Sequence, residues 1–231
     1  MQIADVANLL VIGLAQGCGY ALVALGFVFI YRATEIVNFA HGELMMLGAF
    51  AVLTFAELGG LGFWAAAALG ILSLGVFGYL LDAIVMRRVI GESQTSIFIL
   101  TVALGVMLKA LAGMIWGYTP LVLQTPFQGT VQLGSITIAT SRLAIIAGTV
   151  IICAMLYLFL SKSRLGLAIQ AASQNQLAAY YSRIPVKRLV SIVWAIGAMV
   201  AAVAGLLMAP VTQVSPEITV IGIKALAGAV V

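Results

Sequence analysis

The sequence predicts an all-α protein, a polytopic bundle of transmembrane helices, and three observations lead to this prediction. Hydrophobic residues make up 64% of the 231 residues, charged residues make up 8%, and the mean hydropathy is +1.20. Ordinary soluble domains contain about 45–50% and about 25% of these two classes. Apolar runs of roughly 20 residues, the length that crosses a bilayer as a helix, recur along the chain. Segments that alternate between apolar and polar residues, which are typical of a transmembrane β-barrel, do not recur along the chain.

The apolar runs predict six spans and the beginning of a seventh. The six lie at residues 6–30, 36–56, 61–86, 95–117, 143–160 and 189–209, and a further apolar segment begins at residues 218–231. The chain stops before this last segment is long enough to cross a bilayer. We therefore expect a single transmembrane domain over residues 1–231 that is truncated at its C-terminus.

Lysine and arginine predict the orientation of the bundle. Eight of the eleven basic residues follow the first span, follow the third span or lie in residues 161–188: Arg32, Arg87, Arg88, Lys162, Arg164, Arg183, Lys187 and Arg188. The opposite connections, at residues 57–60, 118–141 and 210–217, contain none. Because cytoplasmic loops carry an excess of positive charge, we expect the basic connections to face the cytoplasm and the N-terminus to lie outside a bacterial inner membrane.

The candidate functional site is residues 35–48, which place several polar groups between two long apolar runs. Glu35, Asn38, His41 and Glu43 all fall here, and His41 is the only histidine. An ionised group at the centre of a bilayer costs about 2.5–3.5 kcal/mol, so such groups usually line a cavity or a solute path. The connection suits a cytoplasmic loop or a re-entrant, broken helix at membrane depth. A purely structural role for His41 at a helix break is the alternative to a path role.

Lys109 is a second candidate because it lies deep within a predicted span. It stands eight residues before the end of the span, about 12 Å along a helix. That distance exceeds the comfortable reach of a lysine to the interface, so we expect a carboxylate partner, Glu43 or Glu57, or a wet cavity. Both a structural ion pair and a place on the solute path remain open.

Glycine spacing and two connections complete the prediction. Small residues four apart predict close helix packing at Gly13 and Gly17, at Gly113 and Gly117, and at Gly197, Ala201 and Gly205.

The uncharged connection 118–141 suits short strands, a lid or a plain spacer. Residues 161–188 predict one or two short helices, since apolar residues recur at helical spacing: Leu165, Ala168, Ile169 and Ala172. That segment could rest on lipid headgroups or dock in a groove of a cytoplasmic partner.

Two stretches resemble one family of permeases. The first is residues 13–50, with Asn38-Phe39-Ala40-His41-Gly42-Glu43 at its centre; the second runs from Ser163-Arg164-Leu165-Gly166 to Arg188 and on to Ala201-Ala202-Val203-Ala204-Gly205. Both are similar to the LivH-type permeases, the membrane subunits of ABC importers for branched-chain amino acids. The resemblance covers nearly the whole chain.

The resemblance implies a heteromeric importer. A periplasmic solute-binding protein would deliver the solute, this chain and a second LivM-like permease would form the path, and two cytoplasmic ATPases would supply the energy. Residues 161–188 would be the coupling segment, with Arg164, Asn175, Ile184 and Arg188 facing an ATPase. ATP and Mg would be bound by the ATPases, because this sequence has no Gly-x-x-x-x-Gly-Lys-Ser/Thr loop. We expect no enzyme activity, cofactor, metal site or nucleic-acid partner in this chain.

Two other classes of function stay open at the level of sequence. Within the family, a urea or short-amide importer carries a similar His-Gly-Glu segment. Outside it, a secondary transporter could use Glu43, His41 and Lys109 as a proton or ion relay, and a channel could use the same lining. The exact solute and the subunit stoichiometry do not follow from the residues.

Overall fold

A computed structural model describes residues 3–57, 59–89, 92–133, 136–174, 179, 181 and 185–230, and it confirms the all-α prediction. The long helices are α1 (Ile3–Thr34), α2 (His41–Glu57), α3 (Phe63–Ile84), α4 (Gln94–Trp116), α5 (Thr140–Lys162) and α8 (Val186–Thr212). Shorter ones are η1 (Met86–Val89), α6 (Arg164–Gln174), η2 (Pro216–Thr219) and α9 (Val220–Val230). Each predicted span corresponds to one long helix. Five of these are long and apolar enough to cross a membrane, while α2 has 17 residues.

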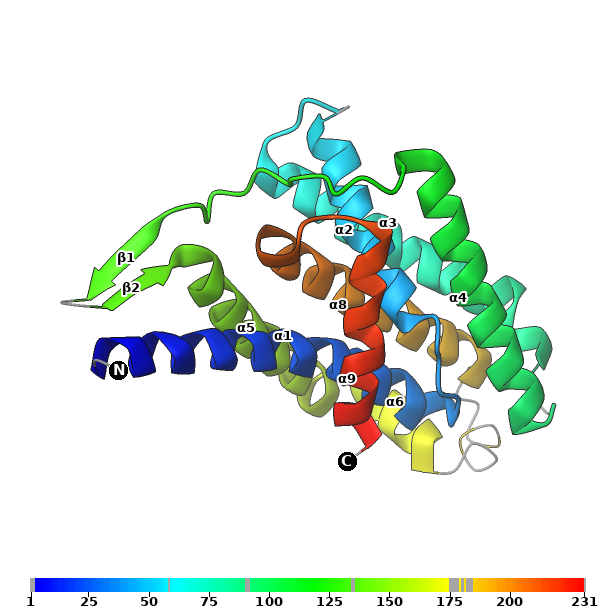
Figure 1. The fold of residues 1–231 in the computed structure, drawn as a ribbon. Helices are drawn as coiled ribbons and strands as arrows, with labels where there is room; N and C mark the ends of the chain where they lie inside the picture. Colours follow the sequence, from blue (N-terminus) through cyan, green and yellow to red (C-terminus); the bar gives the residue numbers. More distant parts are fainter. Residues whose placement is uncertain are drawn as a thin grey trace.

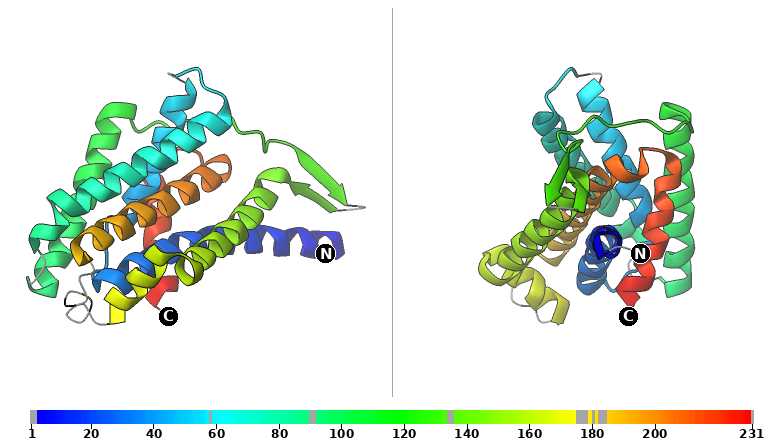
Figure 2. Two further views of the ribbon diagram at one scale, coloured as in Figure 1. Left: turned by 180° about the vertical axis from the view of Figure 1, so that it is seen from behind. Right: turned by 60° about the vertical axis from the view of Figure 1, so that its left-hand side comes forward.

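Helix α8 lies at the centre of the bundle, with α2 and α3 packed along it and α1 on another side (Figures 1 and 2). Its residues Trp194, Ala201 and Met208 are fully buried. Small residues bring the backbones together at this centre. A Cβ at Gly205 would overlap the Met45 carbonyl, and a Cβ at Gly48 would overlap Ala202, both between α2 and α8. The core of the chain is therefore built around the α2–α8 and α3–α8 contacts.

The predicted small-residue pairs have different outcomes. Gly197 and Gly205 of α8 contact α1 and α2 closely, as predicted. Gly113 is packed by the Tyr118 ring. At Gly13 and Gly17 the prediction is wrong for the described part of the chain, since no neighbouring atom lies within 4 Å of a Cβ built at either position. The N-terminal end of α1 extends beyond the bundle beside the hairpin (Figure 1). Gly13 and Gly17 are both exposed, so they lie on a side of α1 that packs against no other described helix.

The connection after α4 crosses the bundle as an extended segment and ends in a hairpin (Figure 1). Leu121 and Val214 exchange two backbone hydrogen bonds of 2.8 Å, which fasten the segment to the chain after α8. Strands β1 (Thr130–Leu133) and β2 (Ile136–Ala139) pair antiparallel, with Thr130 opposite Ala139. Of the predicted alternatives, short strands are the observed one.

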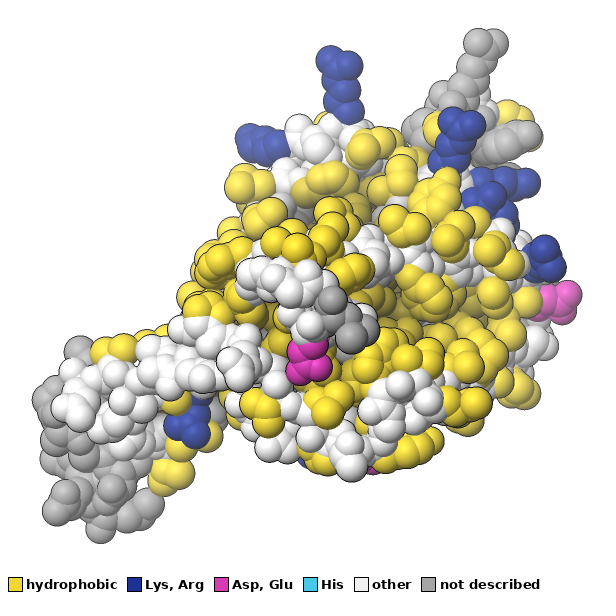
Figure 3. Space-filling model, turned by 90° about the horizontal axis from the view of Figure 1, so that it is seen from above, with side chains coloured by type: hydrophobic (Ala, Val, Ile, Leu, Met, Phe, Trp, Pro, Cys, Tyr) yellow, Lys and Arg dark blue, Asp and Glu magenta, His cyan; other side chains and the backbone are white. Residues whose placement is uncertain are grey.

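The ends of α1, α3 and α5 and the beginnings of α4 and α8 gather at one end of the bundle, at the lower right of Figure 1 and the left of the rear view in Figure 2. All three basic connections start from that end. Seen from above, the surface is mostly hydrophobic, with the few Lys and Arg side chains projecting at its margins (Figure 3). The arrangement agrees with a membrane protein whose basic loops share one side.

Candidate functional site

The break between α1 and α2 holds the polar residues that the sequence singled out. Helix α1 ends at Thr34, whose hydroxyl donates to the Ile30 carbonyl at 2.8 Å and accepts from the Ile36 amide at 3.2 Å. Glu35 follows with φ of 57°, in the left-handed region that few non-glycine residues adopt. The helix therefore stops at Thr34 although apolar residues continue beyond it.

Asn38 sets the start of the next helix. Its Oδ1 accepts from the Ala40 amide at 3.1 Å, and its carbonyl accepts from the His41 amide at 3.1 Å. Asparagine favours such turns because its side chain replaces a backbone partner. Helix α2 begins at His41, so the predicted start of this span at residue 36 is wrong by five residues. The other four of residues 36–40 are apolar, and they made the turn at Asn38 look like part of the span.

Three residues of this break carry buried polar atoms that form no hydrogen bond of ordinary geometry with any described residue. They are Asn38 Nδ2, both ring nitrogens of His41 and Glu43 Oε2. Asn38 is 1% exposed and His41 is fully buried. A buried donor or acceptor without a partner costs about 1–3 kcal/mol, so native structures usually satisfy such groups. These groups therefore keep bonding capacity that the described side chains do not use, as do Thr125 Oγ1 and Trp194 Nε1 elsewhere in the chain.

The His41 ring lies against α1. Its centroid is 4.6 Å from that of the Phe27 ring, and the Val23 backbone lies beside it. A Cβ at Gly26 would overlap the imidazole, so glycine is what lets the ring lie there. At the next residue, a Cβ at Gly42 would lie 2.9 Å from the Thr219 carbonyl. The start of α2 is thus held between α1 and the segment made of η2 and α9.

Glu43 points to α4, and Lys109 lies one turn further along that helix. A Cβ at Gly105 would lie 3.1 Å from Glu43 Oε2, so the absence of a side chain there makes room for the carboxylate. Lys109 Nζ, however, pairs with Glu217 Oε1 at 3.1 Å. The predicted partners, Glu43 and Glu57, are therefore not the ones in the structure. The Lys109 and Glu217 side chains are 32% and 70% exposed.

Glu35 is separated from the other three residues of the stretch. It is exposed and lines a cavity of about 380 Å³ between the break and the start of α4. Tyr31, Gln94 and Thr95 supply other polar groups to that cavity. Asn38, His41 and Glu43 do not line it. The structure thus divides the stretch into a buried cluster and an exposed carboxylate.

The predicted coupling segment contains α6, which folds back on the end of α5. Ser163 Oγ accepts from the Gly166 amide at 2.9 Å, and Gln170 Nε2 donates to the Leu160 carbonyl at 3.1 Å. A Cβ at Gly166 would overlap the backbone of α5. Leu165 and Leu167, on either side of Gly166 around the helix, are 48% and 53% exposed. The helix is amphipathic, as the sequence predicted.

The structure describes two of the four predicted coupling residues. Arg164 begins α6 and Arg188 lies in the first turn of α8, and both are exposed. Asn175 and Ile184 lie outside the described residues. Among the described residues, no group of three or more His, Cys, Asp or Glu side chains could hold a metal ion.

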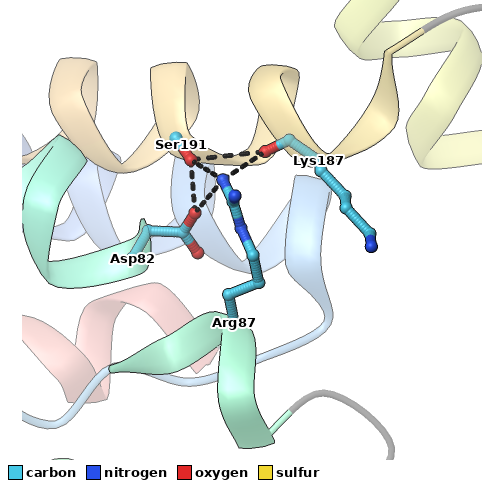
Figure 4. Close-up of polar contacts among 4 residues, drawn as sticks. All are labelled: Asp82, Arg87, Lys187 and Ser191. Atoms are coloured by element: carbon cyan, nitrogen blue, oxygen red, sulfur yellow. Dashed lines mark hydrogen bonds and ion pairs between the residues drawn. The ribbon is translucent and has the colours of Figure 1, made fainter. Parts of the chain in front are cut away.

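Sequence reasoning missed a second buried polar cluster, at Asp82 (Figure 4). Asp82 is 1% exposed and accepts a hydrogen bond of 2.6 Å from Ser191 Oγ. Arg87 Nη2 lies 3.7 Å from the same carboxylate oxygen and donates to Ser191 Oγ at 2.6 Å. The proximity of Asp82 and Arg87 in sequence was the available signal, but Ser191 lies 109 residues from Asp82 and no local pattern marks it.

Residues 9–231 match the family described as "Branched-chain amino acid transport system / permease component". Among curated proteins, the chain is 29% identical over 212 residues to the high-affinity branched-chain amino acid transport system permease protein BraD of Pseudomonas aeruginosa, covering 86% of this chain and 69% of that one.

It is 28% identical over 209 residues to LivH of Escherichia coli (strain K12) and to LivH of Salmonella typhimurium, high-affinity permease proteins of the same kind of system. These matches cover 85% of this chain and 68% of each relative. A comparison with solved structures gave no match.

Proposed function

Since the chain belongs to the family of permease components of branched-chain amino acid transport systems, we propose that it carries branched-chain amino acids across the bacterial inner membrane as one subunit of an ATP-driven importer. The names of its relatives BraD and LivH support the solute class. Its five long apolar helices suit a multi-pass membrane protein. The ATP hydrolysis would take place in other subunits, because this sequence has no phosphate-binding loop.

The observation that carries the proposal is the set of unpartnered buried groups where α2 begins. A branched-chain amino acid has an apolar side chain, an ammonium and a carboxylate. Glu43 Oε2 could accept from the ammonium, while Asn38 Nδ2 and a protonated ring nitrogen of His41 could donate to the carboxylate. The helix start also suits an anion, since the backbone amides of a first turn lack helical partners. Lys109 adds a positive charge on the neighbouring helix, and Glu35 would belong to the cavity beside the path.

The end of the bundle that gathers the basic connections would face the cytoplasm and the ATPases. Helix α6 supports this, because its inner face is packed on α5 while Leu165 and Leu167 are exposed beside Arg164. Exposed apolar side chains beside a positive charge suit docking against a partner. Residues 161–188 would then be the coupling segment, with Asn175, Ile184 and Arg188 completing the ATPase-facing surface, and the N-terminus would lie outside.

The remaining partners follow from the same proposal. A second, LivM-like permease would complete the path, two ATPases binding ATP and Mg would drive it, a periplasmic protein would deliver the solute, and lipid would cover the outer helices. Selectivity would rest largely with the periplasmic protein.

The test is uptake of radiolabelled leucine into proteoliposomes that contain the chain with its ATPases, its second permease and the solute-binding protein. We expect uptake that requires ATP inside the vesicles and that excess isoleucine or valine, but not urea, inhibits. Uptake driven by a proton or sodium gradient without ATP would instead identify a secondary transporter. Competition by urea or short amides would change the solute class and keep the importer.

A further inference from the structure

Helices α3 and α8 meet along a seam that ends in the Asp82 cluster. Gly75, Gly78 and Asp82 occupy one face of α3 at spacings of three and four residues. A Cβ at Gly78 would lie 2.6 Å from the Trp194 carbonyl of α8, and one at Gly75 would lie 2.9 Å from Met199. The face of α3 therefore lies against the α8 backbone at Gly78 and against the Met199 side chain at Gly75. Asp82 closes the same face against α8, at the end where the basic connections gather.

Ser191 contacts every other group drawn in the cluster, namely Asp82, Arg87 and the Lys187 carbonyl (Figure 4). A hydroxyl has one proton, and the shorter of its two acceptor contacts is Asp82 Oδ2 at 2.6 Å, against 3.3 Å to the Lys187 carbonyl. Its oxygen accepts from Arg87 Nη2, which also donates to the Lys187 carbonyl at 3.1 Å. The guanidinium thus bonds to two points of the first turns of α8 while it lies beside the carboxylate of α3.

Stability alone does not account for such a cluster. Replacing a buried ion pair by apolar residues is often neutral or stabilising, and the better-attested use of buried charges is to fix one arrangement of packed elements. Here the arrangement fixed is that of η1, the end of α3 and the start of α8. Helix α8 begins at Val186, within the proposed coupling segment of residues 161–188. The cluster therefore lies where a displacement of that segment would enter the bundle.

We propose that Asp82, Arg87 and Ser191 are positioning residues that make α3 follow α8 when an ATPase displaces residues 161–188. This inference rests on the proposed function, because it assigns the cluster a part in coupling. With the cluster intact, a movement of the first turn of α8 is passed to α3 through the guanidinium and the carboxylate. Without it, α8 could move while α3 stays behind, and ATP would be hydrolysed with little transport.

The chain offers a matched control for this inference. Arg88 stands next to Arg87 in the same 3₁₀ helix, is exposed, and forms no ion pair or side-chain hydrogen bond with the described residues. Substituting either arginine by alanine removes the same charge from the same connection. Only Arg87→Ala removes the contacts to α8.

The experiment compares Arg87→Ala and Arg88→Ala in the assembled importer and measures leucine uptake and ATP hydrolysis together. We expect Arg87→Ala to lower the uptake per ATP by about fivefold or more, the lower end of ordinary coupling between linked elements, while ATP hydrolysis continues. Arg88→Ala should leave the ratio unchanged. An unchanged ratio in Arg87→Ala would overturn the proposal. If Arg87→Ala fails to assemble, the double variant Asp82→Asn with Arg87→Gln takes its place, because it leaves no unpaired buried charge. The uptake per ATP of that variant then tests the proposal in the same way.

A second readout separates this inference from the proposed function. Spin labels at Ile84 of α3 and Lys187 of α8, with Cys18 and Cys153 replaced by serine, report the distance between the two helix ends in the full chain in nanodiscs. Ile84 is 53% exposed, and the Lys187 side chain points away from the cluster (Figure 4). Arg87→Ala should broaden the distance distribution relative to Arg88→Ala. Equal widths would refute the cluster's role even in a working importer. Broadening in a chain that shows no uptake would support the cluster as the positioner of α3 and α8 while overturning the importer proposal and, with it, the part in coupling.

Discussion

Among the described residues, the buried polar cluster at Asp82 and the one at the start of α2 differ in whether the chain satisfies their hydrogen bonds. At Asp82, the carboxylate, the Ser191 hydroxyl and the Arg87 guanidinium contact one another. At the start of α2, polar atoms of Asn38 and His41 are as deeply buried, yet they form no hydrogen bond of ordinary geometry with a described residue. The first cluster joins two parts of the chain. The second has polar atoms without a described side-chain partner and is the one that we propose contacts the solute.

The comparison teaches that burial of a polar group does not by itself mark a binding site. A satisfied cluster contributes to a fixed arrangement of helices, and removing one member leaves the others unpaired. An unsatisfied cluster already carries that cost, so removing a member should be cheap for folding and expensive for transport. Substitutions at the start of α2 should therefore lower uptake with little loss of stability, whereas substitutions in the Asp82 cluster should lower stability as well as the uptake per ATP.

The largest expected effect on stability is at Arg87. Arg87→Ala should lower the free energy of unfolding by about 2 kcal/mol, less than for a fully buried pair because the side chain is 32% exposed. The reason is that Asp82 loses its positive neighbour and Ser191 loses a donor. Chemical unfolding in detergent micelles measures the change. Adding Asp82→Asn to Arg87→Ala should recover part of the lost stability, because it removes the unpaired charge. As a control, the free energy of unfolding of Arg88→Ala should stay within about 0.5 kcal/mol of that of the wild type. A loss at Arg88 as large as at Arg87 would contradict this account.

The next largest effect is expected at Glu43, where a substitution should change transport without lowering stability. Glu43→Gln keeps the shape of the side chain and removes a charge with an unpartnered oxygen, so the free energy of unfolding should stay equal or rise. Leucine uptake should fall about tenfold or more, since a hydrogen bond to a charged group is worth about 1.5–3 kcal/mol. Glu57→Gln, at the exposed end of the same helix, is the control and should leave uptake unchanged. Normal uptake by Glu43→Gln would remove this carboxylate from the path.

A smaller effect tests the space beside Glu43. Gly105→Ala and Gly17→Ala both replace a helical glycine, a change worth up to about 1 kcal/mol in helix propensity. At Gly17 there is open space, so the substitution should stabilise the isolated chain. At Gly105 the new methyl group would lie 3.1 Å from Glu43 Oε2, and the carboxylate would have to move. We expect the unfolding free energies of the two variants to differ by about 1 kcal/mol, with lower uptake for Gly105→Ala only. Equal stabilisation would mean that the carboxylate moves freely.

The sequence predicted the helices because each one depends on local hydrophobicity. The prediction failed at residues 36–40, where apolar residues hide a turn that depends on the conformation of Glu35 and the side chain of Asn38. The sequence did reveal the polar residues of the candidate site, because charges between long apolar runs are conspicuous in any bilayer-spanning chain.

Partners across the bundle could not be predicted in the same way. Ser191 meets Asp82 only because Gly75 and Gly78 let α3 and α8 pack closely, and that packing depends on the whole fold. The same limit applies to Lys109. Its position in a span predicted a carboxylate partner or a wet cavity, with Glu43 and Glu57 as the candidate carboxylates. The partner in the structure is Glu217, which was not among them.

The smallest effect on stability is expected at that ion pair. Glu217→Gln should change the free energy of unfolding by less than about 0.5 kcal/mol, because the carboxylate is 70% exposed and exposed pairs are worth little. Its loss leaves Lys109 to interact with the Glu43 carboxylate, which also faces α4. Uptake should therefore respond to Glu217→Gln only in a chain that retains Glu43. Unfolding and uptake of Glu217→Gln, Glu43→Gln and the double variant form the test. A loss of stability near that of Arg87→Ala would make Lys109–Glu217 a structural link of the same kind as the Asp82 cluster, and the division between satisfied and unsatisfied clusters would not hold.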